Sequence, residues 1–225
     1  MTPVAVQRRL FLARHAETGT VTPDGRLQSA GNVPLTGRGR AQADALGRAF
    51  AAAALSHVHS STQARAMETA ERLAGPGATL VAHKDLEEIS LGRAEGRPAR
   101  DAFAAAPGYL VDPDVALEGG ETPRQVLGRV GPAIERILAQ EGDAPLVAVV
   151  GHGCVNRMLL AHLLELDLWR ALRLRQDWSG VNVLEYRDGG WELGALNWNP
   201  DGLAEFGRTR GIAGVAPEVW KQLGR

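Results

Sequence analysis

Two apolar runs that each lead to a histidine constrain this chain most. Residues 8–14 have the pattern of a strand, and this strand delivers Arg14 and His15 to the loop that follows. The second run, 146–150, ends shortly before His152. In an open α/β sheet, ligands bind outside the carboxyl ends of the strands. We therefore predict that the two histidines and the arginine meet in one site, and an arginine in such a site suits a phosphate.

Strand and helix patterns alternate along the chain. Short apolar runs predict strands at residues 8–14, 58–60, 79–82 and 146–150. Apolar residues at helical spacing predict a helix capped by Thr36 with Leu46, Ala49, Phe50 and Ala53 on one face, and a helix from Thr62 with Ala66, Ala70 and Leu73 buried. A long helix is expected from Pro123, with a buried stripe of Leu127, Val130, Ile134, Ile137 and Leu138. Further helices are expected near 101–105, after His152 up to about Leu164, and near 217–223. This order predicts an α/β fold.

The last strands are expected to form a hairpin from 181–187 and 191–196, turning at 188–190. The resulting architecture is a three-layer α/β/α sandwich with a mostly parallel sheet and an antiparallel addition. We expect one domain over residues 1–225, with a core of about 8–197 and a C-terminal tail of 198–225.

Composition narrows the class of partner. The net charge of −1 gives no reason to expect nucleic acid or an acidic membrane surface. The N-terminal apolar run is too short for a signal peptide, and no segment approaches the roughly 20 apolar residues of a membrane span. The single cysteine, Cys154, rules out an internal disulfide and fits a reducing compartment. These features predict a cytoplasmic protein.

Six segments, taken in order, resemble those of the histidine phosphatase superfamily, whose fold is phosphoglycerate mutase-like. They are LARHAET at 12–18, PLTGRGRAQA at 34–43, SSTQARAMETA at 60–70, LEEISLGRAEG at 86–96, GGET at 119–122 and VGHG at 150–153. One such segment alone would be weak, but six in the family order are specific.

The resemblance implies a role for each residue of the site. His15 would attack phosphorus with one ring nitrogen while a backbone carbonyl holds the other, and water would later hydrolyse the phosphohistidine. A neutral imidazole can do this near pH 7, because its ordinary pKa is about 6.5. Arg14 and Arg65 would grip phosphoryl oxygens as bidentate forks, and a protonated His152 would add a charged hydrogen bond. Glu88 would be the general acid that protonates the leaving oxygen.

Several neighbours of these residues leave alternatives open. Glu87 offers a second carboxyl, although the Leu-x-Glu and Glu-x-x-x-Gly spacings select Glu88. We expect Cys154 to be a small buried side chain rather than a nucleophile. For Arg157 we favour a structural ion pair over contact with substrate. The other histidines match no family segment and are expected in packing or surface positions: His57, His59, His83 and His162.

One family feature has no clear counterpart. The family usually carries a phosphate-binding asparagine shortly after the first histidine, and Asn32 corresponds to a different position. Thr20 or Thr22 is the expected replacement donor, with Thr18 as a further candidate. On the second strand, Gly153 is expected to contact the phosphate.

Together these features favour a metal-independent phosphomonoesterase that acts on a small phosphorylated metabolite and needs no cofactor. Two alternatives remain: a bisphosphoglycerate-dependent phosphoglycerate mutase and a noncatalytic phosphate-binding module. Mutases insert basic residues between the general acid and the second histidine, and here Arg93, Arg97 and Arg100 are the near candidates. The protein is also a candidate homodimer.

The loop 19–34 and the tail after Asn197 form a candidate lid over the organic part of the substrate, because loops on a rigid scaffold often carry specificity. Trp198, Phe206 and Trp220 supply large apolar surfaces for such a role. Packing of the tail outside the domain, or at a dimer contact, is the equally weighted alternative.

Overall fold

One mixed sheet of six strands organises the structure, a computed structural model that describes residues 6–28, 33–53 and 55–200. The strands are β1 (Arg8–Arg14), β2 (His57–Ser61), β3 (Thr79–His83), β4 (Leu146–Gly151), β5 (Val181–Arg187) and β6 (Gly190–Trp198). Their order across the sheet is β3-β2-β4-β1-β5-β6. The first four are parallel to one another, and β5 and β6 extend the sheet as an antiparallel hairpin. The predicted mostly parallel sheet is confirmed.

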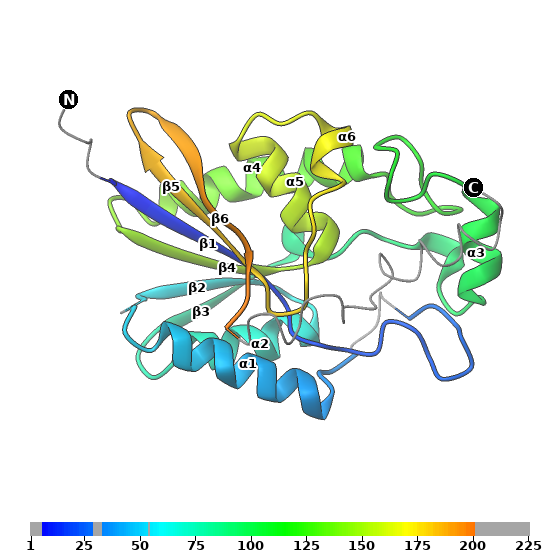
Figure 1. Cartoon of the computed structure of the whole chain (residues 1–225), viewed down its shortest axis with the longest axis horizontal. Helices are drawn as coiled ribbons and strands as arrows, with labels where there is room; N and C mark the ends of the chain where they lie inside the picture. Colours follow the sequence, from blue (N-terminus) through cyan, green and yellow to red (C-terminus); the bar gives the residue numbers. More distant parts are fainter. Residues whose placement is uncertain (1–5, 29–32, 54, 201–225) are drawn as a thin grey trace.

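Helices cover both faces of the sheet (Figure 1). They are α1 (Gly37–Phe50), α2 (Ala64–Ala74), α3 (Ala99–Ala105), α4 (Pro123–Gln140), α5 (Gly153–Leu163) and α6 (Leu168–Ala171), with short 3-10 turns η1 (Lys84–Leu86) and η2 (Gly92–Ala94). The helices α1 and α2 lie on one face, and α4 and α5 lie on the other. This arrangement is the predicted three-layer sandwich.

Each central strand buries apolar side chains on both faces, as parallel strands between two helix layers must. Leu10 and Leu12 of β1 join the cluster under α4 and α5, whereas Ala13 joins the cluster under α1 and α2. The next strand, β4, alternates in the same way, with Val149 on the first side and Val150 on the second. The alternation fixes β1 and β4 in the sheet, and with them the direction in which their carboxyl ends point.

The first helix matches its predicted cap but not all of its predicted face. The Thr36 hydroxyl accepts a hydrogen bond from the Gly39 N–H at 2.9 Å and so caps α1. Leu46 and Phe50 are buried as expected, but Ala49 is exposed and the helix ends before Ala53. The buried residues of α1 are Gly39, Gln42, Ala43, Leu46 and Phe50. The buried face of the helix therefore follows residues spaced four apart, and Ala49 lies at the edge of that face.

The other helices differ from prediction mainly at their ends. Helix α2 begins at Ala64 rather than Thr62, and the Thr62 hydroxyl donates to Glu87 instead of capping the helix. Helix α4 begins at Pro123 behind a capping box formed by Thr122 and Gln125. Its predicted stripe is buried at Val130, Ile134 and Ile137 and half-buried at Leu127 and Leu138.

Two features near the C-terminus complete the comparison. Helix α6 was missed because four residues are too few to show a helical period; Asp167 caps it. The predicted hairpin of β5 and β6 is confirmed, with Asp188 and Gly189 both at positive φ in the turn. The predicted helix 217–223, and Phe206 and Trp220 of the candidate lid, lie outside the described residues.

Two glycine substitutions, one in α1 and a control in α4, test how closely α1 and α2 pack. A Cβ on Gly47 of α1 would lie 2.3 Å from the Arg72 carbonyl oxygen of α2, so Gly47→Ala should push the helices apart and destabilise the protein by about 1–3 kcal/mol. Gly128 lies exposed in α4 with open space around it, so Gly128→Ala should stabilise by roughly 0.5–1 kcal/mol. Urea unfolding measures both changes. Equal effects from the two substitutions would contradict the close approach.

Candidate active site

The parallel pairing of β1 with β4 brings the two predicted histidines together. Arg14 lies opposite Gly151 in the register, and the His15 N–H donates to the Gly151 carbonyl at 3.0 Å. His15 and His152 therefore leave adjacent strands at the same edge, with ring centroids 5.1 Å apart. The predicted meeting of the two strand ends is confirmed.

The His15 ring is held in one tautomer. Its Nδ1 lies 2.7 Å from the Ala16 carbonyl oxygen, which can only accept, so Nδ1 carries the proton and Nε2 has a free lone pair. Burial, helped by Arg65 and Arg14, lowers the pKa of His15 well below 6.5. The imidazole is therefore neutral at pH 7. The backbone carbonyl that we expected on the second nitrogen is present.

Two buried guanidinium groups flank this imidazole and keep donors unused. Arg14 donates through Nη1 to the Gln176 carbonyl at 2.7 Å and lies 5.8 Å from the Trp178 ring centre. Arg65 donates through Nη2 to the Gln63 side chain at 2.6 Å. Within the described chain, Nε of Arg14 and both Nε and Nη1 of Arg65 are buried without a hydrogen-bond partner. Burial lowers the pKa of Arg14 to about 10, so it stays charged at pH 7.

The second histidine is completely buried at the start of α5. Neither ring nitrogen of His152 has a hydrogen-bond partner among the described residues. Burial, with Arg65 as the next cause, holds the pKa of His152 well below 6.5. The ring is thus neutral at pH 7, and the charged hydrogen bond considered in the sequence analysis would need a proton on it. A phosphate dianion beside the ring would favour the charged form again, because an opposite charge raises the pKa of a histidine.

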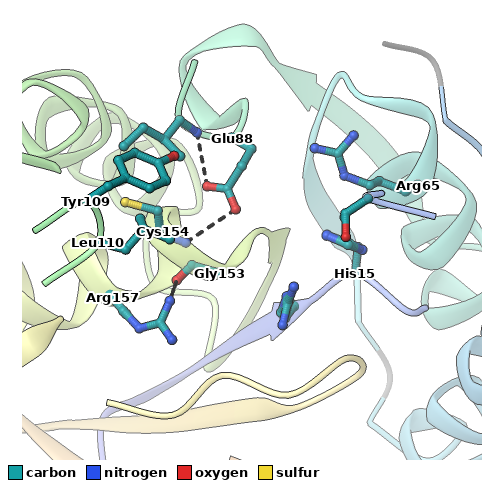
Figure 2. A pocket seen from close by; sticks show the side chains of 11 residues that line it. His15, Arg65, Glu88, Tyr109, Leu110, Gly153, Cys154 and Arg157 are labelled. Carbon is teal, nitrogen blue, oxygen red and sulfur yellow. Dashed lines mark hydrogen bonds between the residues drawn. The ribbon is translucent and has the colours of Figure 1, made fainter. Parts of the chain in front are cut away.

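The two adjacent carboxyls take different positions. Glu88 lines the cavity (Figure 2), where its oxygens accept from the N–H groups of Ile89 at 3.0 Å and Cys154 at 3.3 Å. Glu87 accepts from the Thr62 hydroxyl at an exposed position and does not line the cavity. The structure thus places Glu88, and not its neighbour, in the cavity lining that also contains His15.

Three threonines were candidates for the missing phosphate donor, and one of them lines the cavity. Thr20 is buried there. The Thr18 hydroxyl donates to the Pro34 carbonyl at 2.7 Å, and the Thr22 hydroxyl donates to Asp24. Thr18 and Thr22 therefore do not reach the cavity, contrary to expectation, because each side chain bonds within its own loop. Gly153 lies in the lining as predicted.

The structure adds lining residues that the sequence reasoning missed. Ile89 follows Glu88 within the segment LEEISLGRAEG, and Tyr109 and Leu110 come from residues 97–118, a stretch expected in the pocket wall but without a motif that singles out individual residues. Arg157 also lines it, and among the described residues it forms no ion pair, unlike our preferred interpretation. Cys154 is buried, and burial raises the pKa of its thiol, which makes it a poor nucleophile.

The remaining histidines lie away from the cavity lining, as expected. His59 bonds both His83 and Glu141, and His57 contacts the same carboxylate. His162 contacts Glu135 at 2.9 Å. In the part of the chain that the structure describes, no group of three or more His, Cys, Asp or Glu side chains is arranged to hold a metal ion. Helices in the same part are all too short or too polar to cross a membrane.

Several known proteins are similar to this chain in sequence and in fold. A probable phosphoglycerate mutase from Salmonella choleraesuis is 28% identical over 190 residues, which cover 81% of this chain and 87% of that protein. A mycobacterial glucosyl-3-phosphoglycerate phosphatase superposes with a TM-score of 0.75 at 27% identity, covering 84% of this chain and 98% of the other. A phosphoserine phosphatase from Entamoeba histolytica, at 20% identity and a TM-score of 0.71 over 85% and 98% of the two chains, shares the fold.

The family assignment rests on a match that spans most of the chain. The model of the histidine phosphatase superfamily (branch 1) matches residues 10–199, which include both strand ends and every charged residue of the cavity lining. The six segments singled out in the sequence all fall within this match. The chain belongs to the histidine phosphatase superfamily.

Proposed function

We propose that this protein is a metal-independent phosphomonoesterase that hydrolyses a small phosphorylated metabolite through a phosphohistidine on His15. The observation that carries the proposal is the free Nε2 lone pair of a buried neutral imidazole, surrounded by unused donors of Arg14, Arg65 and His152. Unpartnered buried donors are costly, and a phosphoryl group would satisfy them. An Nε2 lone pair among such donors suits attack on phosphorus.

The first step breaks the ester bond. Nε2 of His15 forms a bond to phosphorus, and the bond from phosphorus to the ester oxygen breaks. The proton of Glu88 goes to that oxygen, so the organic part leaves as an alcohol. Arg14 and Arg65 stabilise the three remaining phosphoryl oxygens, whose charge the site meets with fixed donors rather than reorienting water.

The second step restores the enzyme. A water molecule attacks phosphorus, Glu88 takes its proton, and the bond between phosphorus and Nε2 breaks. Inorganic phosphate and a neutral His15 result. The hydrogen bond from Nδ1 to the Ala16 carbonyl holds the ring in place through both steps, so the same lone pair is presented each time.

The basic residues between Glu88 and His152 favour a phosphatase over a mutase. In the mutases, basic residues in this region hold the substrate carboxylate. Here Arg93 and Arg97 contact Glu118, Arg100 contacts Asp101, and none of the three lines the cavity. The mutase remains the second candidate, because the Salmonella relative carries that name.

One experiment separates the three candidate functions. The purified protein is assayed in a chelator for release of p-nitrophenol from p-nitrophenyl phosphate, and for isomerisation of phosphoglycerate with and without bisphosphoglycerate. A phosphatase releases p-nitrophenol and phosphate in the chelator. Isomerisation that depends on bisphosphoglycerate would identify a mutase, and phosphate binding without turnover would identify a binding module.

Replacing the proposed nucleophile should abolish turnover. We expect His15→Ala to lower kcat for p-nitrophenyl phosphate by at least ~10³, because no covalent intermediate can form. Rapid quench of the unaltered protein with a labelled substrate should trap an acid-labile, base-stable adduct that is missing from the variant. Near-normal turnover of His15→Ala would overturn the assignment.

The proposed general acid should matter most for poor leaving groups. Glu88→Gln should lower kcat/KM, which reports the first step alone, for an alkyl phosphate by roughly 10²–10⁴ and for p-nitrophenyl phosphate much less, since p-nitrophenolate leaves without a proton. Glu87→Gln is the matched control, because its carboxyl lies outside the cavity. Equal losses on both substrates in Glu88→Gln, or the selective loss in Glu87→Gln, would argue against Glu88.

The buried neutral histidines should make stability depend on pH. His15 and His152 have pKa values far below 6.5 in the folded protein but close to 6.5 in the unfolded chain. The unfolded chain therefore binds more protons as the pH drops below 6.5, and the free energy of unfolding should fall between pH 7 and pH 5. Denaturant unfolding in phosphate-free buffer measures this. The variant with both histidines changed to asparagine should show a shallower dependence; an unchanged slope would contradict the assignment.

A further inference from the structure

Arg157 is a buried cation that forms no ion pair among the described residues. It lies on α5, one helical turn beyond His152, and only 9% of the residue's surface is exposed. Its Nε donates to the Leu174 carbonyl at 2.7 Å, and its Nη1 donates to the Gly153 carbonyl at 3.1 Å. Both acceptors are neutral. Among the described residues, Nη2 has no hydrogen-bond partner and no carboxylate lies within ion-pair distance.

This free edge belongs to the same cavity as the proposed phosphoryl site. A Cβ on Gly153 would lie 3.5 Å from Nη1 of Arg157 and 3.6 Å from Cζ of Arg14, so both guanidinium groups border one glycine. In Figure 2, Arg157 occupies the side of the cavity opposite Arg65. A substrate whose phosphoryl group is held by Arg14 and Arg65 would therefore extend its organic part past Arg157.

The cavity places its cations on two sides. Its charged lining residues are Arg14, Arg65, Arg157 and Glu88. Arg14 and Arg65 act on His15 and would face the phosphoryl group, whereas Arg157 lies on the side opposite Arg65 (Figure 2). Of the acids outside the lining, Asp177 pairs with Arg175, and Glu121 pairs with Arg129. Arg157 is therefore left for an anionic group on the organic part of the substrate.

A second unused group lies on the same side. The Tyr109 hydroxyl is buried and, in the described chain, has no hydrogen-bond partner. Figure 2 places its ring beside Leu110 and Cys154, on the Arg157 side of the cavity. A buried hydroxyl without a partner is unusual in native proteins. The side of the cavity away from Arg65 therefore offers both a charge and a hydrogen-bonding group to a polar ligand.

We propose that Arg157 binds a carboxylate on the organic part of the substrate, so that the enzyme selects small phosphomonoesters that carry a carboxylate. This proposal rests on the proposed phosphomonoesterase activity. A planar carboxylate with a single charge matches the one guanidinium group on this side of the cavity. It would accept hydrogen bonds from Nη2 of Arg157, and charged hydrogen bonds of this kind are the strong ones.

A matched pair of substrates tests the proposal on the unaltered protein. In 3-phosphoglycerate a carboxylate stands where glycerol 3-phosphate has a CH₂OH group, and the two are otherwise alike. We expect kcat/KM for phosphate release to be about 10- to 100-fold higher for 3-phosphoglycerate, with most of the difference in KM. Equal values would overturn the carboxylate proposal and leave the phosphatase intact. Failure to release phosphate from either substrate or from p-nitrophenyl phosphate would overturn the proposed function instead.

Two variants assign the preference to Arg157. Arg157→Met should reduce the ratio of the two kcat/KM values to nearly one, and Arg157→Lys should restore part of it because the charge returns without the fork. Arg97→Met is the control: this exposed arginine pairs with Glu118 outside the cavity, and its ratio should match the unaltered protein. An unchanged ratio in Arg157→Met would overturn the proposal.

A further measurement covers the case in which Arg157→Met does not fold, since two backbone carbonyls would lose their donor. Binding of glycerate and of glycerol to the unaltered protein is compared by isothermal titration calorimetry, in saturating inorganic phosphate to occupy the phosphoryl site. Glycerate that binds at least tenfold tighter than glycerol supports a separate carboxylate site. Equal affinities of the two would contradict it.

Discussion

The register between β1 and β4 is the constraint on which the site depends. Backbone hydrogen bonding places Arg14 opposite Gly151, so the residues that follow, His15 and His152, emerge side by side. Parallel pairing aligns the carboxyl ends of both strands, and burial of both faces prevents a slip, because a shift of one residue would turn every core side chain to the wrong layer. The apolar alternation that stabilises the sheet thus also sets the distance between the two imidazoles.

The same rigidity supports a cluster of charges that would otherwise be unfavourable. Arg14, Arg65 and Arg157 are nearly buried, and each guanidinium group donates a hydrogen bond to a neutral amide oxygen rather than to a carboxylate. Burying a cation without an opposite charge costs free energy, so such an arrangement persists only where the surrounding structure holds it. In return, the donors already point to where a phosphoryl group would bind, and no reorganisation is needed during the reaction.

The electrostatics also explain why the histidines stay neutral. Burial, together with the nearby cations Arg65 and Arg14, opposes a further positive charge, which lowers the pKa values of His15 and His152 together. For His15 this protects the lone pair that we propose attacks phosphorus. For His152 a bound phosphoryl dianion would raise the pKa again, so we expect protonation of this ring to be coupled to binding.

The sequence by itself determined the order of strands and helices and the edge of the sheet where Arg14, His15 and His152 meet, and it singled out Arg65 and Glu88 as candidate partners for them. These were readable because period, caps and short motifs are local properties of the chain. Only the tertiary structure decided that Thr20 and not Thr22 reaches the cavity, and that Tyr109 completes its wall. It also decided that Arg157 keeps a free edge, since its partners at Leu174 and Gly153 come from separate segments. Which polar group remains unsatisfied depends on neighbours distant in the sequence, and local patterns carry no information about them.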